Sequence, residues 1–392
     1  MTELDPPDAV VFSDDVLRQL SSATSGGLVC PQLRRLTWTS SYGWEPMQRF
    51  LSPHLTSVLF YEEYKMEPNT DMALFPTLSL LPTTHLEDLN LNLYQPLTPI
   101  HSVLSEVAQR LSPCFKSLAT CSSLSEAAWE HLGSLPKLEW LRVSDTPRTE
   151  ILKLIPRQDT FPALRSIEIR LNDAYQPWSY FFSLLESSPL QEVTVTAGRT
   201  IQGVGVPGRV LTAMLEAELQ RTINGLTFSG SDPADLTFLL YVGRFSSLKT
   251  MKCTTRCRRQ RQCVSPITDS DAEQLASGLP RLVTVWLGHE CKYTHHNTTV
   301  KSLISFSTHC LSLDGLCFPC NLTNISEDIK TESGLPDPRL EISSPCKLQF
   351  LALIWVVLPP PDDVEALRIV TSALDHLFPC FHPGEGWGLF VK

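Results

Sequence analysis

The amino-acid sequence predicts an α/β solenoid, a right-handed coil of about twelve degenerate strand–helix repeats whose parallel strands form one concave sheet. Three observations predict this fold. A short apolar pattern recurs along most of the chain, stretches with helical spacing lie between its occurrences, and proline precedes most of them. A repeat of about 28 residues cannot bury its apolar face alone, so neighbouring repeats must stack.

The recurring pattern is apolar-x-x-apolar-x-apolar, and its last four positions alternate between apolar and variable residues. This alternation is typical of a short strand with one buried face. Successive occurrences are 22 to 35 residues apart, so the repeats are irregular. The pattern begins at Leu33, Leu55, Leu86, Phe115, Leu138, Leu164, Leu190, Ile223, Leu248, Leu282, Leu313 and Leu348.

Helical spacing is clearest in two of the intervening stretches, residues 126–135 and 209–219. In the second stretch one face of the predicted helix carries Leu211, Met214, Leu215 and Leu219. A third helix is predicted after residues 270–273, which have the Ser-x-x-Glu spacing of a capping box, and it ends at Gly278.

Prolines mark the transition from helix to strand. Proline lacks the amide hydrogen that a helix interior needs and disfavours helical angles in the residue before it, so it ends the helix. The prolines at or just before the predicted strands are Pro31, Pro53, Pro82, Pro113, Pro136, Pro162, Pro189, Pro280 and Pro345.

The repeats predict three segments. Residues 1–27 form an N-terminal leader and capping helix, residues 28–358 form the solenoid, and residues 359–392 form a C-terminal helix and tail. Only 32 residues precede the first repeat, and the C-terminus lacks an obvious polar capping repeat, so we expect a partial sequence.

Composition excludes several classes of protein. The chain has 392 residues, is 42% hydrophobic and carries a net charge of −10, which fits a large core and argues against a general nucleic-acid binder. The longest apolar run, residues 350–358, is about half of the roughly 20 residues that cross a bilayer. Without a secretory signal among residues 1–15, we expect a cytoplasmic or nuclear protein with free thiols and no membrane or nucleic-acid partner.

The repeats resemble the leucine-rich-repeat region of fungal F-box proteins, in which degenerate Pro-x-Leu-x-x-Leu-x-Leu units recur at irregular length. The closest stretches are residues 161–169 (FPALRSIEI), 267–288 (ITDSDAEQLASGLPRLVTVWLG) and the opening CPQLRRLTWTS with RFLSPHLTSV. The resemblance covers about residues 28–358. Leucine-rich repeats also occur in ribonuclease-inhibitor-like and other scaffolds.

In the F-box family the repeats hold a substrate, and an N-terminal F-box of about 40 to 50 residues docks on the adaptor of a cullin-RING ubiquitin ligase. The chain departs from the family here, because its one N-terminal helical candidate, residues 14–23, is too short for three helices. We expect the F-box to be missing, so the resemblance implies a cullin-ligase adaptor as partner only if the full-length protein has one.

No catalytic motif is recognised, so we expect a binding scaffold that is not an enzyme and uses no cofactor. Gly203, Gly205 and Gly208 spell G-x-G-x-x-G ahead of a helix. A dinucleotide-binding turn requires these glycines directly after a strand, whereas this predicted strand ends near Thr196. A loop between repeats is the favoured interpretation.

Cysteines and histidines between residues 253 and 320 contain enough ligand types for zinc, but not the two close pairs at regular separation of a structural zinc site. Cys253 takes an inward strand position and Cys317 an outward one, as expected of a small core residue and a surface residue. The other candidates considered are Cys257, Cys263, His289, Cys291, His295, His296 and Cys320.

A basic cluster interrupts the otherwise acidic chain. A solvated loop is the favoured interpretation, and a nuclear-import signal or a site for phosphate or acidic peptide is the alternative. The cluster consists of Lys252, Arg256, Arg258, Arg259 and Arg261.

The strand register predicts where a protein partner binds. The second and third apolar residues of each pattern point into the core, so the residue before each and the residue after the last point outward from the concave sheet. Exposed aromatic and arginine side chains are typical of interface hot spots. A register error of one residue, or covering loops, would instead bury them. The predicted surface comprises Tyr61, Trp140, Arg142, Glu168, Arg170, Glu192, Trp286 and Phe350.

The sequence therefore predicts a protein–protein interaction scaffold. The leading hypothesis is the substrate-recognition repeats of an F-box-type ubiquitin-ligase receptor, and the alternative is a ligase-independent leucine-rich-repeat binding protein. The sequence does not name the bound partner.

Overall fold

The computed structural model divides the chain into two compact units. Unit 1 comprises residues 1–170 with 187–189, and unit 2 comprises residues 171–186 with 190–392. The residues that the structure describes are 27–39, 46–61, 74–92, 100–120, 123–144, 159–171, 178–197, 206–231, 238–255, 264–289, 295–325, 350–359 and 362–378, together with Val16, Gln19, Ser22 and Leu348.

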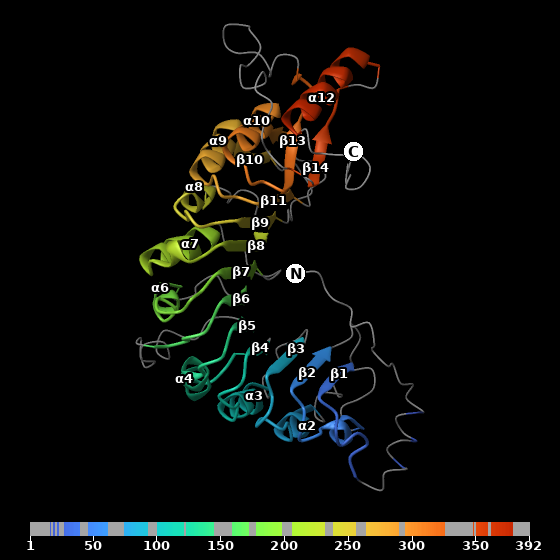
Figure 1. Cartoon of the computed structure of the whole chain (residues 1–392), viewed down its shortest axis with the longest axis vertical. Helices are drawn as coiled ribbons and strands as arrows, with labels where there is room; N and C mark the ends of the chain where they lie inside the picture. Colours follow the sequence, from blue (N-terminus) through green and yellow to red (C-terminus); the bar gives the residue numbers. More distant parts are fainter. Residues whose placement is uncertain are drawn as a thin grey trace. The chain divides into compact units, whose positions relative to one another are not determined.

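Unit 1 alternates strands and helices, and each strand pairs in parallel with the next one along the chain. Helices α2, α3 and α4 pack each against the next on one side of these strands (Figure 1). The strands are β1 Arg35–Thr39, β2 Ser57–Tyr61, β3 Asp88–Asn92, β4 Ser117–Ala119, β5 Trp140–Ser144 and β6 Ser166–Leu171. The helices are η2 Pro46–Phe50, α2 Leu74–Ser79, α3 Ile100–Gln109 and α4 Glu126–Ser134.

Unit 2 repeats the plan, with its main strands in the order β7-β8-β9-β11-β13-β14 and a separate parallel pair, β10 and β12. The strands are β7 Glu192–Ala197, β8 Gly225–Ser231, β9 Thr250–Thr255, β10 Val264–Thr268, β11 Thr284–His289, β12 His295–Asn297, β13 Gly315–Asn321 and β14 Phe350–Val357. The helices are α6 Trp178–Ser183, α7 Val206–Glu216, η4 Leu219–Arg221, α8 Leu239–Val242, α9 Asp269–Gly278, α10 Val300–His309 and α12 Val364–Leu377.

The predicted α/β fold class with parallel strands is confirmed. Every predicted strand is present, and each begins two residues after the start of its pattern, as β5 begins at Trp140 for the pattern at Leu138. The β10–β12 pair was not predicted. No helix among the described residues is long and apolar enough to cross a membrane.

The predicted helices are present with small differences. Helix α4 begins at Glu126 as predicted and ends at Ser134, one residue before the predicted end, whereas α7 begins three residues earlier than predicted and ends at Glu216. Leu211 and Met214 are buried as predicted, and Leu219 is buried in η4, but Leu215 is only half-buried. Its place in the core is taken by the smaller Ala213 and Ala217.

The predicted capping box at residues 270–273 is wrong. Helix α9 begins one residue before Ser270, and its N-cap is Thr268, whose hydroxyl accepts from the Asp271 amide while the Asp271 carboxylate accepts from the Thr268 amide. The same chemistry therefore operates two residues earlier, directly where β10 ends. The predicted end of this helix at Gly278 is confirmed.

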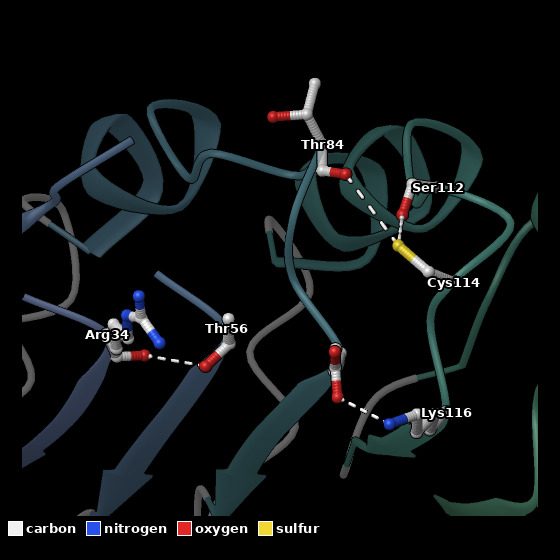
Figure 2. Close-up of polar contacts among 7 residues, drawn as sticks. Arg34, Thr56, Thr84, Ser112, Cys114 and Lys116 are labelled. Carbon is white, nitrogen blue, oxygen red and sulfur yellow. Dashed lines mark hydrogen bonds and ion pairs between the residues drawn. The ribbon is translucent and has the colours of Figure 1, made fainter. Parts of the chain in front are cut away.

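One carbonyl at the start of each strand fixes the register of the next repeat. The Arg34 carbonyl accepts from the amides of both Thr56 (2.8 Å) and Ser57 (3.1 Å), and Figure 2 shows the Thr56 hydroxyl donating to it as well. Equivalent carbonyls accept two amides each from the following repeat at Thr56, Glu87, Lys116 and Glu139 in unit 1, and at Gln191, Asn224, Lys249 and Val283 in unit 2.

Side chains also bind the free carbonyls at the ends of the preceding helices. Arg110 donates to the carbonyls of Ser79 (3.0 Å) and Leu81 (3.3 Å). The Cys114 thiol, which contacts the Ser112 hydroxyl, lies 3.9 Å from the Thr84 carbonyl (Figure 2). Helix ends leave carbonyls without intrahelical partners, so these bonds satisfy them from the neighbouring repeat.

The predicted segment boundaries at residues 27 and 358 remain predictions. Most of the predicted leader lies outside the described residues, and α12 falls within the predicted C-terminal segment.

Candidate functional site

The face of each unit's main sheet that carries the outward strand positions is here called the open face. Exposed and buried side chains alternate along β5. Trp140 and Arg142 are partly exposed, and the residues that follow each of them, Leu141 and Val143, are buried. The open face of unit 1 thus has the predicted register. Its charged residues, among those described, are Arg35, Asp88, Arg142, Glu168 and Arg170.

Four of the predicted surface residues of unit 1 form one contiguous cluster, which we call the β5–β6 cluster: Trp140, Arg142, Glu168 and Arg170. Arg142 and Glu168 are paired in the parallel register of β5 and β6. The Arg142 Nε and Nη2 atoms each lie 2.6 Å from Glu168 Oε2, and the guanidinium carbon lies 5.4 Å from the centre of the Trp140 ring. Arg142 therefore joins a cation–π contact to an ion pair.

Arg170 completes the cluster with a longer contact. Its Nε atom lies 3.4 Å from Glu168 Oε1. The side chain of Glu168 is 15% exposed, that of Arg142 24% and that of Arg170 37%, so the carboxylate is shielded and Arg170 is the outermost group. Within the described part of the chain, neither Nη atom of Arg170 has a hydrogen-bond acceptor.

The other predicted surface residues lie apart from the β5–β6 cluster. Tyr61, 40% exposed, ends β2 of unit 1, and Glu192 is exposed at the start of β7 in unit 2. Trp286, 36% exposed, lies in β11 in register with Lys252 of β9. Phe350 starts β14, but its side chain lies outside the described residues. A binding role for any of them stays a prediction.

The prediction that Cys317 is a surface residue is wrong. It does occupy an outward strand position in β13, but its side chain is fully buried, and burial raises the pKa of the thiol to about 12. The register places it beside Trp286 of β11, and a tryptophan on the neighbouring strand is large enough to cover a thiol. Cys253 is buried as predicted, and Cys320 is buried as well.

The basic cluster and the zinc candidates fall largely outside the described residues. Lys252 is partly exposed on β9, whereas Arg256, Arg258, Arg259 and Arg261 are not described. Among the described residues no three histidine, cysteine or acidic side chains gather in a way that could hold a metal ion. Of the three glycines of the G-x-G-x-x-G motif, only Gly208 is described, and it lies in the first turn of α7.

A second charged group near β3 was not predicted. The Lys116 ammonium lies 2.6 Å from Glu87 Oε2, and this bond lowers the pKa of Glu87 and raises the pKa of Lys116 (Figure 2, Lys116 labelled). The next residue, Asp88, lies on the open face, and its pKa is raised by burial and by the charge of Glu87. The sequence contained a signal for this pair. Glu87 and Lys116 are each the second residue of the apolar pattern in successive repeats, so they are expected side by side.

No protein-family model matches the chain. No curated protein matches it by sequence either. Among solved structures, the chain is similar to the leucine-rich repeat-containing protein LegL7 from Legionella pneumophila, with a TM-score of 0.40 and 10% sequence identity over 86% of this chain and 97% of that chain. The repeat pattern and the parallel strands give each unit an α/β fold of stacked strand–helix repeats.

Proposed function

We propose that the chain is a protein-binding scaffold and that the β5–β6 cluster on the open face of unit 1 is its partner site. The observation that carries this proposal is the partly exposed Trp140, whose ring centre lies 5.4 Å from the guanidinium carbon of Arg142 on the same strand. Tryptophan and arginine dominate interface hot spots, and side chains fixed before binding lose little entropy when a partner docks.

The proposal assigns no reaction to the site. Arg142 and Arg170 are both bound to Glu168, so the one carboxylate of the cluster is engaged as an ion-pair partner. A surface of this kind binds through shape and charge, as broad repeat sheets do.

The test is site-specific photo-crosslinking in cell extract. A photoreactive amino acid replaces Ser117, which is partly exposed beside Trp140 on β4, in one variant, and Glu130, exposed on helix α4, in the matched control. We expect a discrete crosslinked protein with the label at position 117 and none with the label at position 130. Equal products at both positions, or none at position 117, contradict the proposal.

We propose further that the bound protein is the substrate of an F-box-type ubiquitin-ligase receptor to which these repeats belong. The support is the resemblance of residues 161–169 and 267–288 to the repeats of such receptors. Co-purification of a cullin and its adaptor with the full-length protein supports this role. Recovery of a stable partner without either of them supports the ligase-independent alternative.

A further inference from the structure

We infer that the β5–β6 cluster recognises an acidic protein segment, with Arg170 binding the partner's carboxylate and Trp140 covering an adjacent apolar side chain. This inference rests on the proposed function and adds the chemistry of the partner. It is carried by the distribution of charge in the cluster and by the Arg170 donors that have no acceptor in the described part of the chain.

The charges of the cluster do not balance. Glu168 supplies one carboxylate, and Arg142 and Arg170 supply two guanidinium groups. Arg142 takes the short contacts to Glu168, at 2.6 Å, and is also in contact with Trp140. Among the described residues Arg170 has only the 3.4 Å contact through Nε, so within the cluster its positive charge is the excess.

The Nη donors of Arg170, which have no acceptor among the described residues, match a carboxylate. The two Nη atoms of a guanidinium form a planar fork that binds both oxygens of a carboxylate, which a lysine ammonium does not reproduce. Arg170 is also the most exposed member of the ion-paired trio, so a partner reaches it without breaking the Arg142–Glu168 pair.

The spacing defines the length of the segment. Trp140 pairs with Ser166 in register, and Arg170 lies four residues further along β6, which corresponds to about 13 Å along the strand. An extended partner segment of about five residues spans this distance with an apolar side chain at one end and Asp or Glu at the other.

The charge of the open face favours a protein over a nucleic acid. Among the described residues of unit 1, this face carries three arginines and two acidic residues, namely Arg35, Arg142 and Arg170 with Asp88 and Glu168. Nucleic-acid binding draws on many phosphate contacts by uncompensated cations, and this mixed surface lacks them.

The experiment selects random twelve-residue peptides, displayed on phage, against the immobilised full chain. The variants are Arg170→Gln, Arg170→Lys and Trp140→Ala. The matched control is Arg165→Gln, which removes an exposed arginine just before β6 that lies outside the cluster. Thermal melts followed by circular dichroism verify that each variant is folded.

We expect the wild-type chain and Arg165→Gln to select peptides enriched in Asp or Glu near an apolar residue. Arg170→Gln and Arg170→Lys should lose the acidic enrichment, and Trp140→Ala should lose the peptides altogether. A selected peptide should bind Arg170→Gln at least about tenfold more weakly than wild type. Replacing the peptide's Asp or Glu by Asn or Gln should weaken binding to the wild-type chain by the same factor. The same replacement should not weaken binding to Arg170→Gln any further.

Several other outcomes overturn the inference, and they are distinguishable. Peptides that depend on Trp140 but lack acidic enrichment, or a loss that Arg165→Gln reproduces, refute the acidic partner and leave the proposed function standing. If no peptide depends on Trp140 or Arg170 and the label at position 117 captures no protein, both proposals fail. A preference for oligonucleotides over peptides in a competition assay also refutes the inference.

Discussion

Asp269 of helix α9 caps the following helix, α10, through Thr299. The Asp269 carboxylate accepts hydrogen bonds from the Thr299 amide and from the Thr299 hydroxyl, both at 2.8 Å. It also accepts from the amide and hydroxyl of Ser302, while the Thr299 hydroxyl accepts from the Lys301 amide. One side chain therefore satisfies donors at the start of a helix 30 residues further along the chain.

Replacing Asp269 by alanine should lower the free energy of unfolding by about 2 kcal/mol, because it leaves helix-terminal donors and two hydroxyl groups without their acceptor. Asp269→Asn retains one acceptor oxygen and should cost about half as much. Urea denaturation measures both. Asp314→Ala, at an exposed aspartate with no side-chain partner among the described residues, is the control and should stay within about 0.5 kcal/mol of wild type.

Gly230→Ala should destabilise the protein by about 1–3 kcal/mol. Gly230 has a positive φ of 78° in the irregular part of β8, and a Cβ atom there would lie 2.5 Å from the Ala197 carbonyl oxygen. The control is Gly208→Ala in helix α7, where the nearest atom is 3.8 Å away and the change should be neutral or stabilising. Equal urea midpoints for the two variants would contradict the strained position of Gly230.

Glu87 and Asp88 should give opposite pH dependences. The pKa of Glu87 is lowered by Lys116, so its stabilising effect is present above the pKa of the unfolded chain and is lost as pH falls through the folded pKa. The pKa of Asp88 is raised by burial, so its ionisation destabilises the fold as pH rises from the unfolded to the folded pKa.

The measurement is the unfolding free energy of Glu87→Gln and Asp88→Asn at pH 4 and pH 7, relative to wild type. Glu87→Gln should lose stability relative to wild type as the pH rises, and Asp88→Asn should gain it. If the unfolding free energies of the two variants, relative to wild type, changed in the same direction between pH 4 and pH 7, the opposite pKa shifts of Glu87 and Asp88 would be refuted.

Cys317 should resist alkylation by iodoacetamide in the folded protein, because burial raises its thiol pKa to about 12. Trp286→Ala should raise the rate of Cys317 alkylation by about tenfold for each unit by which exposure lowers that pKa. Peptide mass spectrometry reports the site, with the exposed Cys30 as the reactive reference and the buried Cys253 as the control for unfolding. Unchanged Cys317 reactivity in Trp286→Ala would show that another group covers it.

Trp140→Ala should weaken partner binding by about 2 kcal/mol or more while leaving the melting temperature nearly unchanged. Trp140 lies at an outward strand position and is partly exposed. Calorimetric titration with the crosslinked partner and thermal melts measure the two effects. A markedly lower melting temperature for this variant would assign Trp140 a structural role instead.

The fold could be predicted from the sequence to the level of individual strands, because the period-2 alternation and the repeated offset define each one. The strand of the pattern at Leu138 begins at Trp140, as its offset predicts. The N-cap of α9 was misplaced because two residues, Thr268 and Ser270, are each followed three positions later by an acidic residue. Which of the two caps the helix depends on where β10 ends. The pair of β10 and β12 lacks the repeat pattern, and β10 contains Pro266.

The outward register of the candidate site could also be predicted, but its contacts could not. The sequence places Arg142 and Glu168 at the same offset in successive repeats, yet the pairing requires that these repeats be neighbours in register. Cys317 is buried at an outward position because of the side chains around it. Alternation along a strand predicts which way a side chain points, but not which neighbours cover it.

The doubled hydrogen bonds at the strand starts have a consequence for how this array can change in length. The Arg34 carbonyl and its equivalents align each repeat with the next before the strand begins, so the residues after the strand do not set the alignment. Insertions are therefore tolerated beyond the strand ends, which accounts for repeats that range from 22 to 35 residues. A deletion that removes one of these carbonyls instead leaves two strand-start amides without their acceptor at once, so viable protein boundaries should fall between strand end and helix start.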